Sequence, residues 1–309
     1  MVTSSFLPSV TVAVAAVCSP KHVERCLQGL AAQKDAPPFE VVVAHDPAWG
    51  DLSGLMREHP GARTVARRGA GNPMELATLA IQEAQGEIIL LTEDHCMPSP
   101  EWVRRLCDAL QPGRAAVGGA IETDADAPGI VWAYYFVDFF RYMKPIPDGP
   151  AHAVSVCNVG YRRADLLQVR SAWEHGFHEP AVHQMLQQRF GTLWLVPGAE
   201  VRMRRNLQLG PAVKERFTGG RMFAVQRLQF ASPGKRLLYA ALAPALPLLL
   251  LGRMARKALR RPGVYLSFLR ALPALGTLVA AWSLGEWIGY LTGHPPHAVV
   301  YAPEVMRAS

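Results

Sequence analysis

The chain has 309 residues, which is enough for one large domain or for a domain with an appendage. Half of its residues are hydrophobic, 18% are charged, and the formal net charge is +7. This balance favours contact with a membrane surface or with a polyanion such as a nucleoside diphosphate. Nucleic acid is excluded as an expected partner, because the sequence has no helix-turn-helix, zinc-finger or RNP-type signature.

The cysteines and the first apolar stretch both indicate a cytosolic compartment. No pair of the five cysteines has the spacing of a zinc site, and their number is odd: Cys18, Cys26, Cys96, Cys107 and Cys157. We therefore expect reduced thiols. The stretch Val10–Val17 lacks a basic n-region, so it reads as a strand and not as a secretory signal. The part of the protein that faces a sugar or nucleotide is then expected on the cytoplasmic side.

Strand and helix patterns alternate over the first third of the chain. The pattern predicts strand Val10–Val17, helix 21–33, strand Phe39–Ala44, a short helix at 52–58, strand Arg63–Ala66, a glycine-rich turn at 67–73, helix 74–85 capped by Gly86, and strand Ile88–Leu91. Such alternation is typical of a mostly parallel, doubly wound sheet flanked by helices. The predicted fold class is therefore α/β.

The same kind of pattern continues to about residue 196. It predicts helix Pro100–Leu110, strand Ala115–Ile121, strand Val154–Val159, helix 180–190 ended by Gly191, and strand 192–196. Residues 130–143 are rich in aromatic side chains. We expect ordinary core packing for them, with a sugar-stacking surface and membrane-facing packing as the alternatives.

A polar cluster, Glu93-Asp94-His95, follows the buried strand at 88–91. Strands of α/β sheets present ligand-binding groups at their carboxyl ends. Two acids and an imidazole placed together there are costly unless a positive charge shares the site, and a divalent cation is the usual solution. The alternative is a solvated acidic turn.

The composition changes from Lys235 onward. Leu237–Leu251 is apolar but interrupted by two prolines, a basic link follows, and residues 264–292 are again apolar. The second segment is long enough to span a bilayer. If both segments spanned as a hairpin, the basic link would lie outside the cell, against the positive-inside tendency. Either one segment is therefore re-entrant or interfacial, or the tendency is overridden. We expect membrane attachment without assigning a topology, and two buried core helices are the alternative.

The order of these motifs resembles family 2 glycosyltransferases, which are inverting enzymes with the GT-A fold that use nucleotide-diphosphate sugars. The resemblance runs across residues 8–230. It is carried by strand 10–17 with helix segment Arg25–Gln33, by Phe39–Asp46, by Gly71-Asn72 with helix 74–85 and Gly86-Glu87, by Thr92–Pro98, and by Cys157–Arg163. The C-terminal apolar pair is similar to that of members that are attached to membranes and build polysaccharides or lipid glycans.

The resemblance implies a division into a catalytic GT-A domain at 8–230, membrane-associated helices at 235–292 and a tail at 293–309. It implies metal-assisted, inverting transfer of a sugar from a nucleotide-diphosphate sugar to a hydroxyl of a lipid-linked or polysaccharide acceptor, at the cytoplasmic side of the cell membrane. One alternative is a non-catalytic GT-A-like scaffold subunit of a membrane glycan-assembly complex. Another is a cytosolic nucleotide-binding protein with no membrane role.

The family holds Mg²⁺ or Mn²⁺ with two acids separated by one residue. Matching Cys96 and Pro98 to the family pattern places Glu93 and His95 at those positions, with Asp94 between them. A shift of one residue selects Thr92 and Asp94 instead. Either alignment departs from two aspartates, although a neutral imidazole can ligate Mn²⁺.

The resemblance also implies donor-binding residues. His45 occupies the position of the family's acid after the second strand, and Asp46 follows it. Arg67 and Arg68 are expected to meet phosphate, and Asn72 belongs to the same region. The alternatives are a plain turn at Asp46-Pro47 and solvated surface arginines.

Inversion requires a base that takes the proton of the acceptor hydroxyl. The resemblance assigns Glu179, directly before helix 180–190, to this role, with Glu174 and His183 as alternatives. An acid at a helix N-terminus is also favourable without any catalytic role. The resemblance further implies that Asn158, Arg216 and Arg221 lie in the acceptor or diphosphate region, while a basic patch beside a membrane is the alternative for the two arginines.

Overall fold

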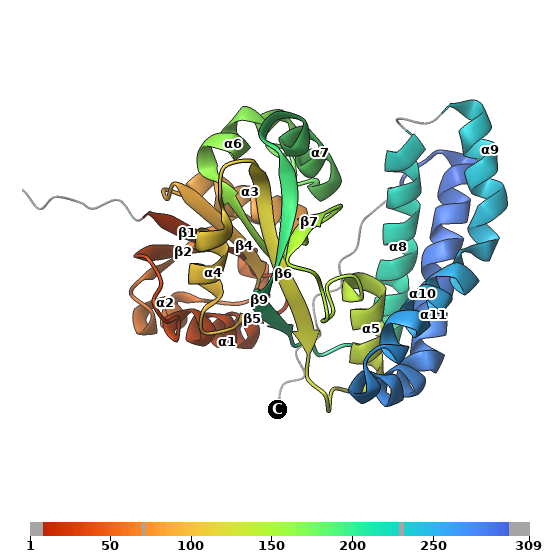
Figure 1. Ribbon diagram of the computed structural model, residues 1–309, viewed down its shortest axis with the longest axis horizontal. Coiled ribbons are helices and arrows are strands. Elements are labelled where there is room, and N and C mark those ends of the chain that lie inside the picture. Colours follow the sequence, from red (N-terminus) through yellow and green to blue (C-terminus); the bar gives the residue numbers. More distant parts are fainter. Residues whose placement is uncertain (1–8, 70–71, 229–231, 297–309) are drawn as a thin grey trace, which may run out of the picture. The chain divides into compact units, whose positions relative to one another are not determined.

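A computed structural model describes residues 9–69, 72–228 and 232–296. The chain divides into two compact units (Figure 1). The first unit contains the chain up to Glu122 and Tyr142–Arg204, and the second contains Thr123–Arg141 and the chain from Arg205 onward. Most of the expected tail, together with positions 70 and 71 of the expected glycine-rich turn, lies outside the described residues.

The first unit is built on one sheet, half of which is parallel. β1 (Val10–Ala15) lies between β2 (Phe39–His45) and β4 (Ile88–Glu93), and β3 (Ala62–Ala66) pairs with β2. Strands buried on both faces are read from sequence as continuous apolar runs, which explains the composition of β1 and β4. Because all these pairs are parallel, the carboxyl ends of the four strands meet at one edge.

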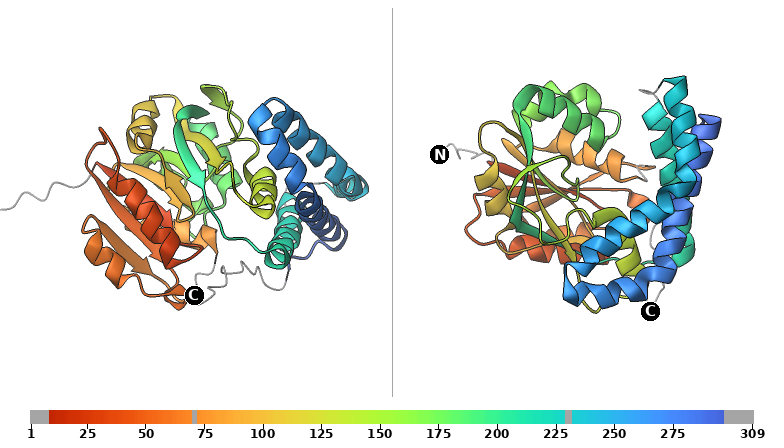
Figure 2. Two further views of the ribbon diagram at one scale, coloured as in Figure 1. Left: turned by 90° about the horizontal axis from the view of Figure 1, so that it is seen from below. Right: turned by 45° about the vertical axis from the view of Figure 1, so that its right-hand side comes forward.

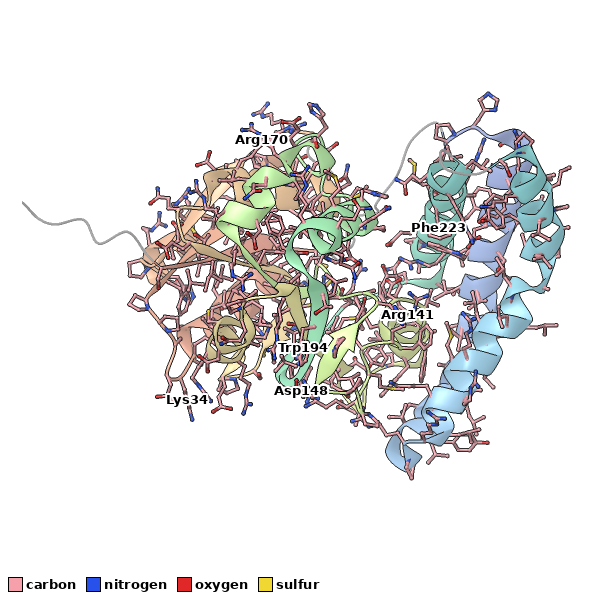
Figure 3. The ribbon with its side chains drawn as sticks, turned by 45° about the horizontal axis from the view of Figure 1, so that its top comes forward. Lys34, Arg141, Asp148, Arg170, Trp194 and Phe223 are labelled. Carbon is pink, nitrogen blue, oxygen red and sulfur yellow. The ribbon has the colours of Figure 1, made fainter. Side chains whose placement is uncertain are left out.

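The other half of the sheet is antiparallel. Its strands are β5 (Cys96–Pro98), β6 (Arg114–Thr123), β7 (Gly149–Ala151), β8 (Asn158–Arg162) and β9 (Thr192–Met203). β8 pairs with β4 so that Asn158 lies opposite Thr92. The chain that leads into β8 therefore arrives at the carboxyl end of β4. At the far edge, the indole of Trp194 donates a hydrogen bond of 2.8 Å to Asp148 (Figure 3).

Helices flank this sheet, as the alternating pattern predicts (Figure 2). They are α1 (Pro20–Ala31), α2 (Ser53–Glu58), α3 (Pro73–Glu83), α4 (Trp102–Ala109), α6 (Arg163–Gln168) and α7 (Glu179–Phe190). α3 packs on β1 and β2, whereas α4 packs on β4 and β9. The predicted α/β class is confirmed, and the expected helices and strands of the first 110 residues occur within a few residues of their predicted bounds.

Three expectations differ from the structure. Gly86 does not cap α3, which ends at Glu83 with Ala84 as its C-cap. The Gly86 amide instead donates to the Thr11 hydroxyl, and a Cβ at Gly86 would lie 2.5 Å from the Thr11 backbone nitrogen, so close strand packing explains this glycine. The strand expected at 154–159 begins only at Asn158, and the strand expected at 192–196 extends to Met203.

The second unit is helical. It contains α5 (Gly129–Phe139), α8 (Leu209–Leu228), α9 (Pro233–Leu242), α10 (Leu246–Leu259) and α11 (Pro262–Thr292). Most aromatic side chains of α5 are buried, which confirms their expected core role. By length and apolar composition, the helical stretches Pro233–Leu259 and Pro262–Thr292 are each able to cross a membrane.

Glycines allow α8 and α11 to pack closely. A Cβ at Gly285 or Gly289 of α11 would collide with backbone or side-chain atoms of α8, whereas a Cβ at Gly276 would meet nothing within 4 Å.

We expect Gly285→Ala to lower the free energy of unfolding of this unit by about 1–3 kcal/mol, because the backbones of α8 and α11 must separate. Gly276→Ala should be neutral or raise stability by up to about 1 kcal/mol, through helix propensity. Thermal unfolding in detergent measures both, and equal effects of the two variants would contradict this packing.

Candidate functional site

The carboxyl edge of the parallel strands collects the polar residues that the sequence singles out. β4 ends in Glu93, and Asp94 and His95 follow it directly. All three are buried, with exposed fractions of 8%, 2% and 4%. His95 Nδ1 lies 3.4 Å from a carboxylate oxygen of Glu93 and 3.9 Å from one of Asp94. A buried imidazole between two carboxylates is an arrangement suited to a cation rather than to a solvated turn.

Asp94 holds the neighbouring loop in place. Its carboxylate accepts hydrogen bonds from the backbone amides of Val17, Cys18 and Ser19, at 3.1, 2.9 and 3.3 Å. These residues link β1 to the start of α1. Thr92 is the other member of the alternative metal pair, and its hydroxyl donates a hydrogen bond to the carbonyl of Cys157. Both side chains of that pair, Thr92 and Asp94, are thus hydrogen-bonded to backbone groups.

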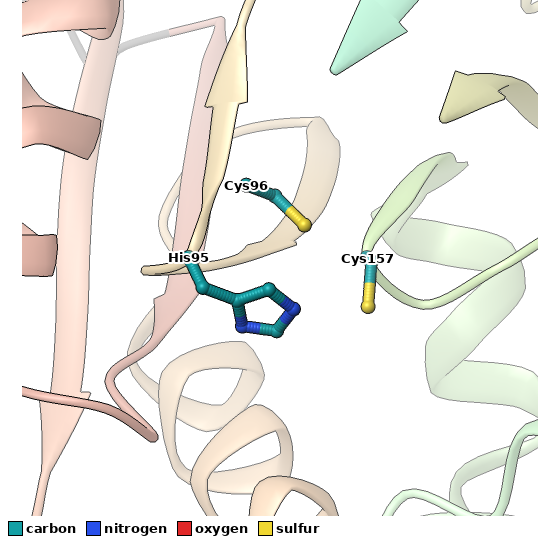
Figure 4. A group of neighbouring side chains, drawn as sticks. All are labelled: His95, Cys96 and Cys157. Atoms are coloured by element: carbon teal, nitrogen blue, oxygen red, sulfur yellow. The ribbon is translucent and has the colours of Figure 1, made fainter. Parts of the chain in front are cut away.

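The thiols of Cys96 and Cys157, which were not predicted as site residues, lie beside His95 (Figure 4). The side-chain donor atoms of His95, Cys96 and Cys157 all lie within 4.8 Å of one another, and so do those of Cys18, Asp94 and His95. Hydrogen bonding to Cys96 and burial raise the pKa of the Cys157 thiol well above its usual value. Sequence spacing gives no sign of this cluster, because the pairing of β8 with β4 is what brings Cys157 to Cys96.

Glu179 reaches the same edge from α7, of which it is the first residue. Its carboxylate accepts a hydrogen bond of 2.7 Å from the backbone amide of Val156. The next residue, Cys157, belongs to the cluster around His95. The predicted base and the predicted metal residues are therefore joined through one short segment of chain that leads into β8.

The two alternative bases have other contacts. Glu174 lies in a turn, where it forms a 3.1 Å ion pair with the exposed Arg170. His183 is buried, and its Nε2 lies 2.7 Å from the hydroxyl of Tyr161. Burial lowers the pKa of His183 to about 4. An imidazole with this pKa is neutral at pH 7 and is held inside the fold.

This buried histidine predicts a pH dependence of stability. Because the pKa of His183 is about 4 in the folded state and 6.5 as a reference, the unfolded chain takes up the proton first as the pH falls. The stabilisation is complete above pH 6.5 and is lost as the pH falls toward 4. We expect a loss of about 3 kcal/mol over that range, which His183→Gln should remove. Urea denaturation at pH 7 and 4.5 measures it, with exposed His175→Gln as the control. The same slope in His183→Gln as in the wild type would contradict this assignment.

The end of β2 places His45 and Asp46 beside the end of β1. Asp46 accepts hydrogen bonds from the backbone amides of Ala48 and Gly69, both at 2.9 Å, so it ties this turn to the loop after β3. His45 borders a small pocket, and burial lowers its pKa. The pocket is lined by Ala16, Ser19, Pro20, Val23, His45, Trp49, Gly50 and Leu52.

The remaining predicted donor residues differ in their surroundings. Arg67 and Arg68 are exposed directly after β3, at the same edge of the sheet. Asn72 caps α3, and its side-chain oxygen accepts a hydrogen bond from the amide of Glu75. Asn158, which was predicted for the acceptor or diphosphate region, is fully buried; its side chain accepts a hydrogen bond from the indole of Trp102 and donates to two strand carbonyls.

The two arginines predicted for the acceptor or diphosphate region, Arg216 and Arg221, lie in the second unit. Arg216 is buried in an ion-pair cluster with Asp138 and Glu215, and it also donates to the hydroxyl of Tyr134. Arg221 donates to the backbone carbonyl of His294. Both arginines are therefore engaged inside this unit, and their assignment to a diphosphate or acceptor region stays a prediction.

Comparison with sequence families finds that the model of Glycosyl transferase family 2 matches residues 11–170, which is more than half of the chain. The match includes β1 to β4, the cluster around His95 and β8. No curated protein matches the chain.

Solved structures show the same fold. S. aureus TarS 1–349 in complex with UDP is 13% identical, with a TM-score of 0.50, and the match covers 89% of this chain and 91% of that one. The mannosyltransferase PcManGT from Pyrobaculum calidifontis, in complex with GDP-Man and Mn²⁺, is 17% identical, with a TM-score of 0.52 and coverage of 91% and 88%. The GT-A-like fold expected from the motifs is therefore confirmed.

Proposed function

Because the chain belongs to glycosyl transferase family 2, we propose that this glycosyltransferase moves a sugar with inversion from a nucleotide-diphosphate sugar to a hydroxyl of a lipid-linked or polysaccharide acceptor. One observation carries the proposal. Glu179 and the cluster around His95 both contact the segment Val156-Cys157, so that the proposed base and the proposed cation site lie on either side of the same short piece of chain. Displacement at a sugar carbon requires both groups within reach of one substrate.

The donor would lie along the carboxyl edge of β1, β2 and β4. The structural neighbours named above bind UDP or GDP-Man. In this chain, the carboxyl ends of β1 and β2 around His45 are a candidate position for the nucleoside, and Arg67 and Arg68 are exposed cations at the same edge for the phosphates. An arginine fork matches phosphate oxygens in charge and geometry.

A divalent cation fits the residues at the end of β4. Glu93 offers a carboxylate and His95 an imidazole, whereas the Asp94 carboxylate is bonded to three backbone amides. A mixed nitrogen and oxygen pair suits Mn²⁺ better than Mg²⁺, which prefers oxygen ligands alone. When bound, such an ion would neutralise the charge of the leaving diphosphate.

Glu179 would accept the proton of the attacking hydroxyl. Its hydrogen bond with the Val156 amide uses one carboxylate oxygen, Oε2, and orients the carboxylate. Proton transfer requires a base within hydrogen-bonding reach of the acceptor hydroxyl. The buried His183 is held by Tyr161, so Glu179 is the better base of the two.

We place the reaction at the cytoplasmic face of a membrane. Two apolar helical stretches at 233–259 and 262–292 support attachment, and the division into a catalytic region at 8–230 and a membrane-associated region at 235–292 is part of this proposal. An acceptor that is itself attached to a membrane or to a growing polysaccharide suits an enzyme held there.

A thermal-shift screen of detergent-purified protein tests the donor site. It uses UDP, GDP, dTDP and CDP, each with and without Mn²⁺, because a ligand that binds the native state raises its stability. A metal-dependent shift with one nucleotide supports the proposal and identifies the donor class. No shift with any nucleotide would instead support a non-catalytic scaffold, a role that the three backbone bonds of Asp94 also permit.

A further inference from the structure

The exposed side of α11 is mostly apolar, and its exposed polar residues are Arg270, Thr277 and Thr292. Its exposed positions recur at intervals of three to four residues, as one face of a helix does. Those with large apolar side chains are Tyr265, Leu266, Leu269, Leu272, Leu284, Trp287 and Leu291. The exposed face of a helix in a water-soluble protein is normally polar. This face therefore needs an apolar partner.

α9 and α10, which form a helical stretch before α11, also expose large apolar side chains. Leu237 and Leu248 are exposed to 73% and 78%, values reached by few apolar side chains in soluble proteins. Leu238, Leu242, Leu249 and Leu259 are exposed as well. Contiguous apolar surface of this extent marks an interaction surface.

Positive charge accompanies this surface. The 53 residues from Pro233 to Gly285, which begin at the start of α9, contain eight lysines and arginines and no aspartate or glutamate. Because the whole chain has a net charge of +7, the rest of the chain is net −1. The excess is thus concentrated in the helices that carry the leucines, where Arg253, Arg256 and Arg260 are exposed on α10 and at its end. Leucines with arginines along helices match an anionic lipid surface.

The opposite side of α11 is covered by protein. Near its beginning, Phe268 stacks edge-on against Phe136 of α5, with ring centroids 5.2 Å apart. Near its end, Gly285 and Gly289 lie against the backbone of α8. The 31 residues of α11 are enough to cross a bilayer, but α5 and α8 would have to enter the bilayer with it.

α5 and α8 are unsuited to the bilayer interior. The pair of helices contains the buried ion pairs of Arg216 with Asp138 and Glu215. α8 also carries Lys214, Arg221 and Arg227 within its 20 residues. Ionised side chains in the hydrocarbon region cost several kcal/mol each. A helix that packs along α8 and α5 cannot then be surrounded by lipid.

We propose that α9, α10 and α11 do not span the membrane but lie in one leaflet of an anionic lipid surface. This inference rests on the membrane attachment proposed above and is independent of the sugar and the acceptor. The leucine faces contact the acyl chains, the exposed arginines contact phosphate headgroups, and α5 and α8 stay on the aqueous side. The basic link between α10 and α11 then remains on the same side of the membrane as α8, which removes the conflict with the positive-inside tendency.

Sidedness tests the proposal directly. Gly210→Cys reports on the start of α8 and Gly263→Cys on the start of α11, and both positions have open space for a side chain. The full chain is expressed in cells, and a membrane-impermeant maleimide is applied to sealed right-side-out and inverted membrane vesicles, with the wild-type chain as the background. We expect both cysteines to react in the same preparation. Reaction in opposite preparations would show a spanning hairpin and would overturn the proposal.

Lipid dependence is the second test. Detergent-purified protein is diluted into vesicles of phosphatidylcholine alone or with phosphatidylglycerol, and sedimentation measures binding. We expect binding to the anionic vesicles at least tenfold stronger, weakening with salt, and lost in Leu248→Glu with Leu266→Glu but not in Leu167→Glu, an exposed leucine of α6. Absence of binding together with a detergent-free dimer would show that a second copy covers this surface. That result overturns the lipid proposal and leaves the nucleotide screen unaffected.

Discussion

Replacing Glu179 with glutamine is expected to lower kcat by about 10²- to 10⁴-fold, because the variant cannot accept a proton from the acceptor hydroxyl. Glutamine has the same shape and can still accept the hydrogen bond from Val156, so the fold and the donor affinity should stay unchanged. The measurement is product formation at saturating donor, together with nucleotide affinity by calorimetry.

Glu174→Gln is the matched control for this prediction. Glu174 lies five residues earlier and pairs with Arg170 at the surface, so its loss should change kcat by less than about twofold. A Glu179→Gln enzyme with nearly normal turnover would contradict the assignment. Inactivation by Glu174→Gln alone would transfer the role of base to that residue.

Removing the two side chains that flank Asp94 is expected to abolish metal-dependent donor binding. In Glu93→Gln with His95→Ala, the affinity for nucleotide with Mn²⁺ should fall by about 100-fold, to the value measured without metal, because the ion loses both a charged oxygen ligand and the imidazole nitrogen. Calorimetry with Mn²⁺, with Mg²⁺ and with a chelator measures this change. Nucleotide affinity that never depended on metal would contradict the predicted cation site.

His95→Asp is a second test of the predicted cation site. It restores an oxygen ligand at the position where the family usually has aspartate, so the preference for Mn²⁺ over Mg²⁺ should decrease. Thr92→Val is the control for the shifted alignment, since it removes a hydroxyl that contacts the Cys157 carbonyl. We expect Thr92→Val to alter stability and not the choice of metal. A change of metal preference in Thr92→Val instead would favour the shifted pair.

Local sequence patterns were sufficient for the elements of the parallel half of the sheet. The apolar runs at β1, β2 and β4 are buried on both faces, so their composition is nearly independent of what surrounds them. The strand expected at 154–159 begins only at Asn158, because Val154 is buried without being part of β8. Burial produces an apolar pattern whether or not a segment pairs as a strand.

The structural role of Asp94 could not be predicted from the sequence of the cluster at the end of β4. All three residues there are polar, and each of them is a candidate metal ligand in one alignment of the motif or the other. Only the folded chain shows that Asp94 binds the amides of residues 17 to 19, which lie more than 70 positions away in the sequence. Contacts of this kind depend on the order of strands in the sheet, and no periodicity records that order.

The sequence by itself determined the α/β class, the family motifs and the concentration of basic and apolar residues after Lys235. These are properties of composition and short-range spacing, which local backbone preference and burial impose directly. The tertiary structure decided two further points. The antiparallel entry of β8 brings Val156 and Cys157 to Glu179 and His95, and the packing of α11 on α5 and α8 leaves the other side of that helix exposed. Both depend on which distant segments become neighbours, and that is settled by the packing of the whole chain.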